Sequence, residues 1–275
     1  MTSLAAKFLV IFDFDWTLID DNSDTYVVEQ LGAGDLMLSL RKELPWTQLM
    51  DRMMHELHLR GRTLPEIDAC LPRIPLHKAM DRAIRGTAAL GCSLHIVSDA
   101  NSHFIATILA AHDLTDCFSS VHTNPAEIDS SGALRVFPFH SLGLPPHGCP
   151  LCPPNMCKGL ILDKLVGDPR PDGLHVIYLG VGGGDYCPSL RLRRGDHVLA
   201  RAGFPLLKRL QNVESGYKSE ATVHVWDSAE DVERLLLGRI PAATGENRDN
   251  DFLSELPYTG QSIILDELQI DNCNG

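Results

Sequence analysis

Apolar residues occur along this chain in two kinds of pattern, which together predict alternating strands and helices. Continuous apolar runs at Phe8–Phe12, 94–97 and 175–179 are typical of strands buried on both faces, and residues 223–226 predict a further strand. Apolar residues spaced three and four apart predict helices, at 78–89, 103–111, 158–165 and 229–237. Ser228 with Asp231 has the spacing of a capping box for the last of these helices. The alternation favours an α/β fold with a mostly parallel sheet.

A helical block interrupts this alternation after the first strand. Residues 25–71 hold few strand signals and many apolar residues at helical spacing, namely Leu36, Leu40, Leu44, Leu49, Met53 and Leu57. We therefore expect an α/β core of residues 1–21 and 76–240, with a small helical cap formed by residues 22–75. Residues 241–275 are polar and acidic, which predicts a flexible tail.

Composition excludes some classes of partner. The 275 residues carry a formal net charge of −12, which argues against nucleic acid or an anionic membrane as the main partner. No apolar stretch approaches the roughly 20 residues that span a bilayer, and no signal-peptide cleavage pattern follows the first apolar run. These features predict a cytoplasmic protein whose cysteines are thiols rather than disulfides.

Polar side chains follow the predicted strands where each strand ends. Asp13 and Asp15 come directly after the first strand, where carboxylates are costly unless they bind something. Ser98 and Asp99 end the second strand, and Lys158 opens a helix. Because ligands of open α/β sheets bind at the carboxyl ends of the strands, these groups predict one site. Two solvated loop carboxylates, or an Asp that caps a helix, remain the alternative reading of Asp13 and Asp15.

These strings resemble the haloacid dehalogenase superfamily of phosphatases. Its four motifs match DFDWT at residues 13–17, Ser98, Lys158 and the glycine-rich loop 180–185. The strings LIDDNSDTYVV, VSDAN, CPPNMCKG and GDYCPS narrow the resemblance to the phosphoethanolamine/phosphocholine phosphatase family, and HGCPLCPPNMCKGLILDKL is most similar to its plant branch. That branch includes enzymes described as acting on pyrophosphate or on thiamine monophosphate, so the resemblance implies a small phosphorylated metabolite as substrate and a Rossmann-like core with a cap.

The resemblance also implies a role for each matching residue. Asp13 would be the nucleophile that forms an aspartyl-phosphate, and Asp15 the general acid and base. Ser98 and Thr17 would contact the phosphoryl group, and Lys158 would offset its charge. Mg²⁺ would be bound by Asp13, by the backbone carbonyl of Asp15 and by Asp185.

The glycine-rich loop departs from the family pattern. Family members carry GDGxxD here, with the first Asp as a metal ligand, whereas this chain reads GVGGGD and places Val181 at that position. One metal ligand is therefore missing. The loop admits two readings by itself, a phosphate cradle or a metal loop, and the resemblance favours the metal loop. A weakened or inactive family member that binds or regulates remains an alternative to an active phosphatase.

Two further acids match positions that recognise the substrate's head group in this family. Asp24 and Asp99 would suit a cationic group such as choline, ethanolamine or thiazolium. The alternative reading is that each caps the helix that follows it.

Three cysteines stand close together before Lys158. Cys149 and Cys152 form a CxxC pair, a common half of a zinc site, and Cys157 follows five residues later. A second pair at the usual spacing is missing. The sequence therefore predicts no structural zinc, and thiols that pack an irregular loop.

Overall fold

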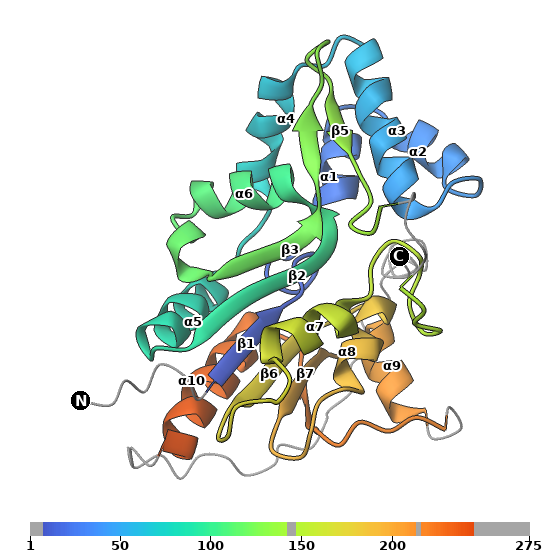
Figure 1. Ribbon diagram of the computed structural model, residues 1–275. Helices are drawn as coiled ribbons and strands as arrows, with labels where there is room; N and C mark the ends of the chain where they lie inside the picture. Colours follow the sequence, from blue (N-terminus) through green and yellow to red (C-terminus); the bar gives the residue numbers. More distant parts are fainter. Residues whose placement is uncertain (1–7, 142–146, 213–215, 245–275) are drawn as a thin grey trace.

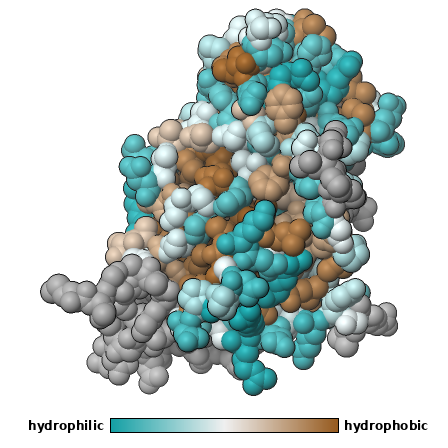
Figure 2. Space-filling model, in the orientation of Figure 1, coloured by the Kyte–Doolittle hydropathy of each residue, from teal (hydrophilic) through white to brown (hydrophobic). Residues whose placement is uncertain are grey.

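The computed structural model describes residues 8–141, 147–212 and 216–244, with side chains up to residue 238. The predicted acidic tail falls almost wholly outside these residues. Within them, no helix is both long enough and apolar enough to cross a membrane. Hydrophobic and hydrophilic residues are interspersed over the face shown in Figure 2.

A parallel sheet of six strands forms the centre of the fold (Figure 1). Its order is β3-β2-β1-β6-β7-β8, so the chain order reverses at β1. Phe12 at the end of β1 pairs with Ile96 of β2 and with Leu179 of β6, which aligns the carboxyl ends of these strands. The strands are β1 (Phe8–Phe12), β2 (Ser93–Asn101), β3 (Ser120–Asn124), β6 (His175–Gly180), β7 (His197–Arg201) and β8 (Thr222–Trp226).

The sheet is buried on both faces, which explains the continuous apolar runs. Alternate residues of β1 enter different clusters: Val10 packs on one face with α5, α6 and α10, whereas Ile11 packs on the other with α7 and α9. The helices are α5 (Lys78–Ala89), α6 (Ser102–Ala111), α7 (Lys158–Val166), α8 (Tyr186–Ser189), α9 (Pro205–Gln211) and α10 (Ala229–Thr244). This arrangement confirms the predicted α/β class.

Five α-helices stand between β1 and β2 in the chain, and the first four of them, α1 to α4, lie above the carboxyl ends of the strands in Figure 1. A β-hairpin of β4 and β5 joins them, and Arg135 of β5 forms a bidentate ion pair with Asp51 of α3 at 2.8 and 2.7 Å. Its strands are β4 (Ala126–Ile128) and β5 (Leu134–Val136). The helices are α1 (Ser23–Gln30), α2 (Gly34–Leu40), α3 (Trp46–Leu59) and α4 (Leu64–Cys70), followed by the short 3₁₀ turn Leu71–Arg73. The sequence predicted the helices but not the hairpin.

Candidate active site

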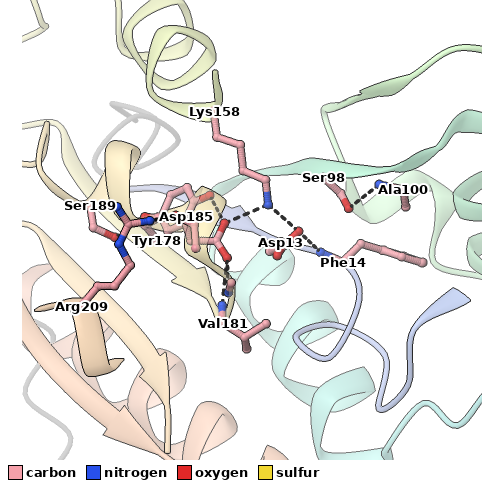
Figure 3. A network of polar contacts seen from close by, with 12 residues as sticks. Asp13, Phe14, Ser98, Ala100, Lys158, Tyr178, Val181, Asp185, Ser189 and Arg209 are labelled. Carbon is pink, nitrogen blue, oxygen red and sulfur yellow. Dashed lines mark hydrogen bonds and ion pairs between the residues drawn. The ribbon is translucent and has the colours of Figure 1, made fainter. Parts of the chain in front are cut away.

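The candidate residues gather at the carboxyl ends of the central strands (Figure 3). Asp13 directly follows β1, Ser98 lies in β2, and Asp185 lies in the 3₁₀ turn Gly183–Asp185 after β6. Lys158 is the first residue of α7, which packs on the face of the sheet that carries Ile11. The point where strand order reverses therefore carries the site, as expected for a doubly wound sheet.

Lys158 lies between two carboxylates. Its Nζ is 2.9 Å from Oδ1 of Asp13 and 2.9 Å from Oδ1 of Asp185. All three side chains are buried, with 6, 8 and 0% of Lys158, Asp13 and Asp185 exposed. Burial alone would lower the pKa of Lys158, but the two carboxylates raise it well above its ordinary value. The lysine is therefore a fixed cation directed at Asp13.

Asp185 is held on all sides by protein donors. Oδ1 accepts hydrogen bonds from Lys158 and from the Tyr178 hydroxyl at 2.7 Å, and Oδ2 accepts from the backbone N–H groups of Val181 and Gly182. Burial would raise the pKa of Asp185, but Lys158 lowers it below its ordinary value. Gly180 makes room for this carboxylate, because a Cβ there would lie 2.5 Å from Asp185 Cγ.

These contacts bear on both readings of the glycine-rich loop. The N–H groups of Val181 and Gly182 point to Asp185, so they do not form a phosphate cradle. Both Asp185 oxygens already accept two hydrogen bonds each, which favours a positioning role over direct metal ligation. The expected ligation by Asp185 thus stays a prediction.

Asp13 and Asp15 lie in different surroundings. The N–H of Phe14 donates to Asp13 Oδ1 at 2.8 Å, and burial and the nearby Asp185 raise the pKa of Asp13, against the effect of Lys158. Asp15 Oδ1 accepts from the N–H of Ser23 at the start of α1, and burial raises the pKa of Asp15 to about 7. A carboxyl that titrates near neutral pH suits a general acid that later becomes a base.

Thr17 and Ser98 present buried hydroxyls beside these acids. Thr17 Oγ1 is fully buried, and no described residue forms a hydrogen bond with it. Ser98 Oγ accepts from the N–H of Ala100 at 3.2 Å, which leaves its own proton free to donate elsewhere. An unpaired buried hydroxyl is costly, so Thr17 is a natural contact for a bound polar group.

The structure also tests the capping alternatives for Asp24 and Asp99. Asn22 is the N-cap of α1, where its side chain accepts from Thr25 N–H, and Asn101 caps α6 in the same way. The reading of Asp24 or Asp99 as a helix cap is therefore wrong. Asparagine supplies the same acceptor without the charge.

Asp24 instead connects the helical cap with the sheet. Its Oδ2 accepts from the Trp46 indole of α3 at 3.0 Å, and its Oδ1 accepts from the Asn101 amide at 3.3 Å. Burial and the charge of Asp15 raise the pKa of Asp24 well above its ordinary value. Asp99 is half-buried, and its charge raises the pKa values of Asp13, Asp15 and Asp24. Both acids therefore lie at the site.

Arg201 matches an arginine of the family in the sequence, where the match predicts a surface or tail-contact residue, but the structure places it against the turn that follows β1. Its guanidinium donates to the carbonyl of Trp16 and to Asp20, each at 2.8 Å, and lies over the Phe204 ring. Trp16 has a positive φ of 58°, a conformation that is costly for a bulky residue. Arg201 thus holds the strained turn that carries the DFDWT motif.

Val181 has no polar contact through its side chain. The side chain is fully buried and belongs to the larger apolar cluster of the core. Its backbone is fixed from both sides, since its N–H donates to Asp185 and its carbonyl accepts from Leu206. Val181 therefore offers a metal nothing but a backbone carbonyl.

Comparison with known proteins identifies the family. The family model described as Putative Phosphatase matches residues 8–240. The thiamine phosphate phosphatase-like protein of Arabidopsis thaliana is 46% identical over 243 residues, which cover 88% of this chain and 98% of that protein. Inorganic pyrophosphatase 2 of the same plant is 42% identical and covers 95% of both chains.

A solved structure supports the fold. The phospho-aspartyl intermediate analogue of phosphoserine phosphatase matches with a TM-score of 0.57 at 18% identity, over 84% of this chain and 98% of that one. The fold and the motifs thus define a phosphatase of the haloacid dehalogenase superfamily. Within it, the chain belongs to the Putative Phosphatase family and is similar to the two plant proteins over most of their length. The resemblance drawn from the sequence is confirmed.

Proposed function

We propose that the protein hydrolyses a small soluble phosphate monoester or anhydride in the cytoplasm, through an aspartyl-phosphate on Asp13. The contact of Lys158 with Asp13 and Asp185 is the observation that carries this proposal. A buried cation beside a buried carboxylate is useful where a phosphoryl dianion must approach that carboxylate. The names of the two plant relatives support the same class of substrate.

The reaction proceeds in two steps. In the first step an Asp13 oxygen attacks the phosphorus, and the bond between the phosphorus and the leaving-group oxygen breaks. Protonated Asp15 gives its proton to the leaving-group oxygen. Asp15, now ionised, then takes a proton from a water that attacks the phosphorus of the aspartyl-phosphate. The acyl-phosphate bond breaks, which releases inorganic phosphate and restores Asp13. Lys158 offsets phosphoryl charge, and the hydroxyls of Thr17 and Ser98 donate hydrogen bonds to phosphoryl oxygens.

The residues present fit Mg²⁺ in part. A carboxylate and a backbone carbonyl are the hard oxygen ligands that Mg²⁺ prefers, and Asp13 with the carbonyl of Asp15 would provide them. Val181 provides no side-chain oxygen, so water and the substrate would complete the coordination. The ion would neutralise charge between Asp13 and the phosphate.

The acids beside the site favour a substrate with a cationic head group. Asp99 is half-buried and Asp24 is buried near it, so two carboxyl groups lie where a cationic head group would favour their ionised form. Thiamine monophosphate, phosphocholine and phosphoethanolamine have a cation there, whereas pyrophosphate has a second anion. We therefore rank the cationic esters first.

A weakened, ligand-binding family member is the second candidate, and Val181 is the observation that favours it. Against this reading, Lys158 contacts both Asp13 and Asp185, and Tyr178 donates a hydrogen bond to Asp185. A protein that only binds phosphate has no need of an acid with a pKa of about 7 next to a nucleophile.

Turnover by Asp13→Asn separates the two candidates. With p-nitrophenyl phosphate and Mg²⁺, we expect wild-type turnover and a loss on the order of 10⁴-fold in the variant, because the nucleophile is absent. Asp35→Asn, which changes an exposed acid in α2, is the control and should keep full activity. Acid-quenched wild type should contain phosphorylated Asp13. A folded Asp13→Asn with wild-type turnover would refute the mechanism, and an inactive wild type at saturating Mg²⁺ would favour the binding protein.

A further inference from the structure

Four cysteines from two distant segments meet beside the active site. Cys149, Cys152 and Cys157 precede α7, and Cys187 lies in α8, which packs beside α7 in Figure 1. The four Sγ atoms all lie within 4.8 Å of one another. Among the residues that the structure describes, no other group of three or more metal-ligating side chains comes this close together.

The spacing of the sulfur atoms is that of a tetrahedral metal site. Sγ of Cys187 is 3.6 Å from Sγ of Cys149 and 3.7 Å from Sγ of Cys157. Four thiolates around Zn²⁺ at about 2.3 Å stand about 3.8 Å apart by tetrahedral geometry. A disulfide would bring two sulfur atoms to about 2.0 Å, so these distances describe separate thiols.

We propose that Cys149, Cys152, Cys157 and Cys187 bind a structural Zn²⁺. The sequence predicted no zinc because a second cysteine pair at the usual spacing is missing, whereas the structure brings a fourth cysteine to the other three. Cys157 and Cys187 form that second pair, but 30 positions separate them in the chain. Four thiolates with no open position are the donor set of a structural zinc rather than a catalytic one.

The loop that carries the first two cysteines is shaped for this role. The N–H of Cys149 donates to Nδ1 of His147, so Nε2 of the same ring carries the proton that bonds the carbonyl of Pro153 at 2.8 Å. The neutral imidazole thus closes the turn around the CxxC pair. The described residues from 147 to 157 form no helix or strand, so the turn has few backbone hydrogen bonds of its own.

The surroundings also suit a cluster with negative charge. Zn²⁺ with four thiolates has a net charge of −2, which favours a nearby cation. Arg191 donates a hydrogen bond to Cys187, and its Nε and the Cys187 sulfur converge on Gly159. A Cβ at Gly159 would lie 2.5 Å from Arg191 Nε and 2.6 Å from Cys187 Sγ. Only glycine therefore leaves space for both groups against α7.

The proposed metal would tie together the two segments that carry active-site residues. Cys157 is the N-cap residue directly before Lys158, and Cys187 follows Asp185 by two positions. A rigid link between these cysteines would hold the lysine and the carboxylate at their 2.9 Å contact. The metal would thus position Lys158 without touching the substrate.

Metal analysis of the full chain tests this proposal. Protein produced without an affinity tag, in zinc-containing reducing medium, should hold about one zinc per chain. Cys187→Ser and Cys152→Ser should each lose most of it, whereas Cys117→Ser, a half-buried cysteine outside the cluster, should keep it. In wild type, Co²⁺ should replace the zinc and give the intense visible absorption of a tetrahedral thiolate site, and this measurement stands even if a variant fails to fold.

Three results would overturn the proposal. The first is wild-type protein that takes up neither zinc nor Co²⁺ under reducing conditions. The second is full zinc content in both cluster variants, which would place the metal elsewhere. The third is a disulfide between cluster cysteines in metal-free protein that retains the wild-type melting temperature. None of these results depends on turnover, so the proposed phosphatase mechanism is tested separately.

Discussion

Asp185 is fully buried and forms a 2.9 Å ion pair with Lys158, although 27 positions separate the two residues. The pair joins the loop after β6 to the first turn of α7. Asp185 also accepts from Tyr178 and from two backbone N–H groups, so each of its four acceptor positions is used. The carboxylate is therefore the fixed point against which the lysine is placed.

Asp185→Asn should lower both stability and turnover. Its amide group must face either Lys158 with Tyr178 or the two N–H groups, and in both orientations donors meet donors. Removing one partner of a buried pair costs about 3–5 kcal/mol of unfolding free energy. Asp81→Asn, which removes a surface ion pair between a half-buried carboxylate and the exposed Arg85, is the control and should cost about 1 kcal/mol or less. Urea denaturation of both variants measures the difference, and equal losses would contradict a special role for Asp185.

Much of the core could be predicted from the sequence, and the misses have physical causes. The apolar run Phe8–Phe12 coincides with β1 because both faces of that strand are buried. The edge strand β3 was missed because its sequence, SVHTN, is largely polar. The β4–β5 hairpin was missed because each strand has three residues, too few to show a period. The capping box Ser228–Asp231 was predicted, and its hydrogen bonds are present.

Some parts of the candidate site could likewise be predicted from the sequence, and others could not. Strand ends and helix starts are visible in a sequence, so Asp13, Ser98 and Lys158 could be placed at one edge of the sheet. Contacts between distant segments are not visible, which is why the bond between Arg201 and Asp20 was missed. The grouping of Cys187 with the earlier cysteines was missed for the same reason.

Asp99 and Asp24 should set the preference for cationic substrates. For Asp99→Asn we expect the ratio of kcat/KM for thiamine monophosphate to that for pyrophosphate to fall by about tenfold or more, because a hydrogen bond to a charged group contributes about 1.5–3 kcal/mol. Asp24→Asn should lower the ratio less, since both Asp24 oxygens already accept from Trp46 and Asn101. A smaller fraction of folded protein would lower kcat/KM for both substrates equally, so it would not change the ratio of the two values.

The control for this comparison is again Asp35→Asn, an exposed acid on the same helical block. It should leave the ratio unchanged. If Asp99→Asn lowers turnover of the two substrates equally, head-group recognition by these acids is wrong, and Asp99 acts on the common phosphoryl group instead.

Val181→Asp should make the enzyme less dependent on high Mg²⁺. Mg²⁺ demands octahedral oxygen ligation, and Val181 leaves one position to water, which brings no negative charge. In the wild type, which has one carboxylate ligand fewer than its family, Mg²⁺ would rely more on the oxygens of the substrate's phosphate for its binding. Binding of the metal and binding of the substrate then become interdependent. The wild-type requirement for Mg²⁺ should therefore fall as the substrate concentration rises. The variant should lose most of that dependence. Its affinity for Mg²⁺ should rise by about 10-fold or more, because mutating even the groups that support metal ligands typically lowers metal affinity by about 10- to 100-fold.

The same substitution should change stability in a way that depends on metal. Val181 is fully buried in the apolar cluster, so an aspartate there is an unpaired buried charge near Asp185 when Mg²⁺ is absent. We expect the melting temperature of Val181→Asp to lie below that of wild type in chelator and to rise with Mg²⁺ far more than that of wild type. Val181→Asn has the same shape without the charge and should show neither the large fall nor the large recovery. Rate curves of wild type and Val181→Asp that superimpose over all Mg²⁺ concentrations would show that residue 181 does not face the metal, and the ligand set would then have to be sought among Asp13, Asp15 and Asp99.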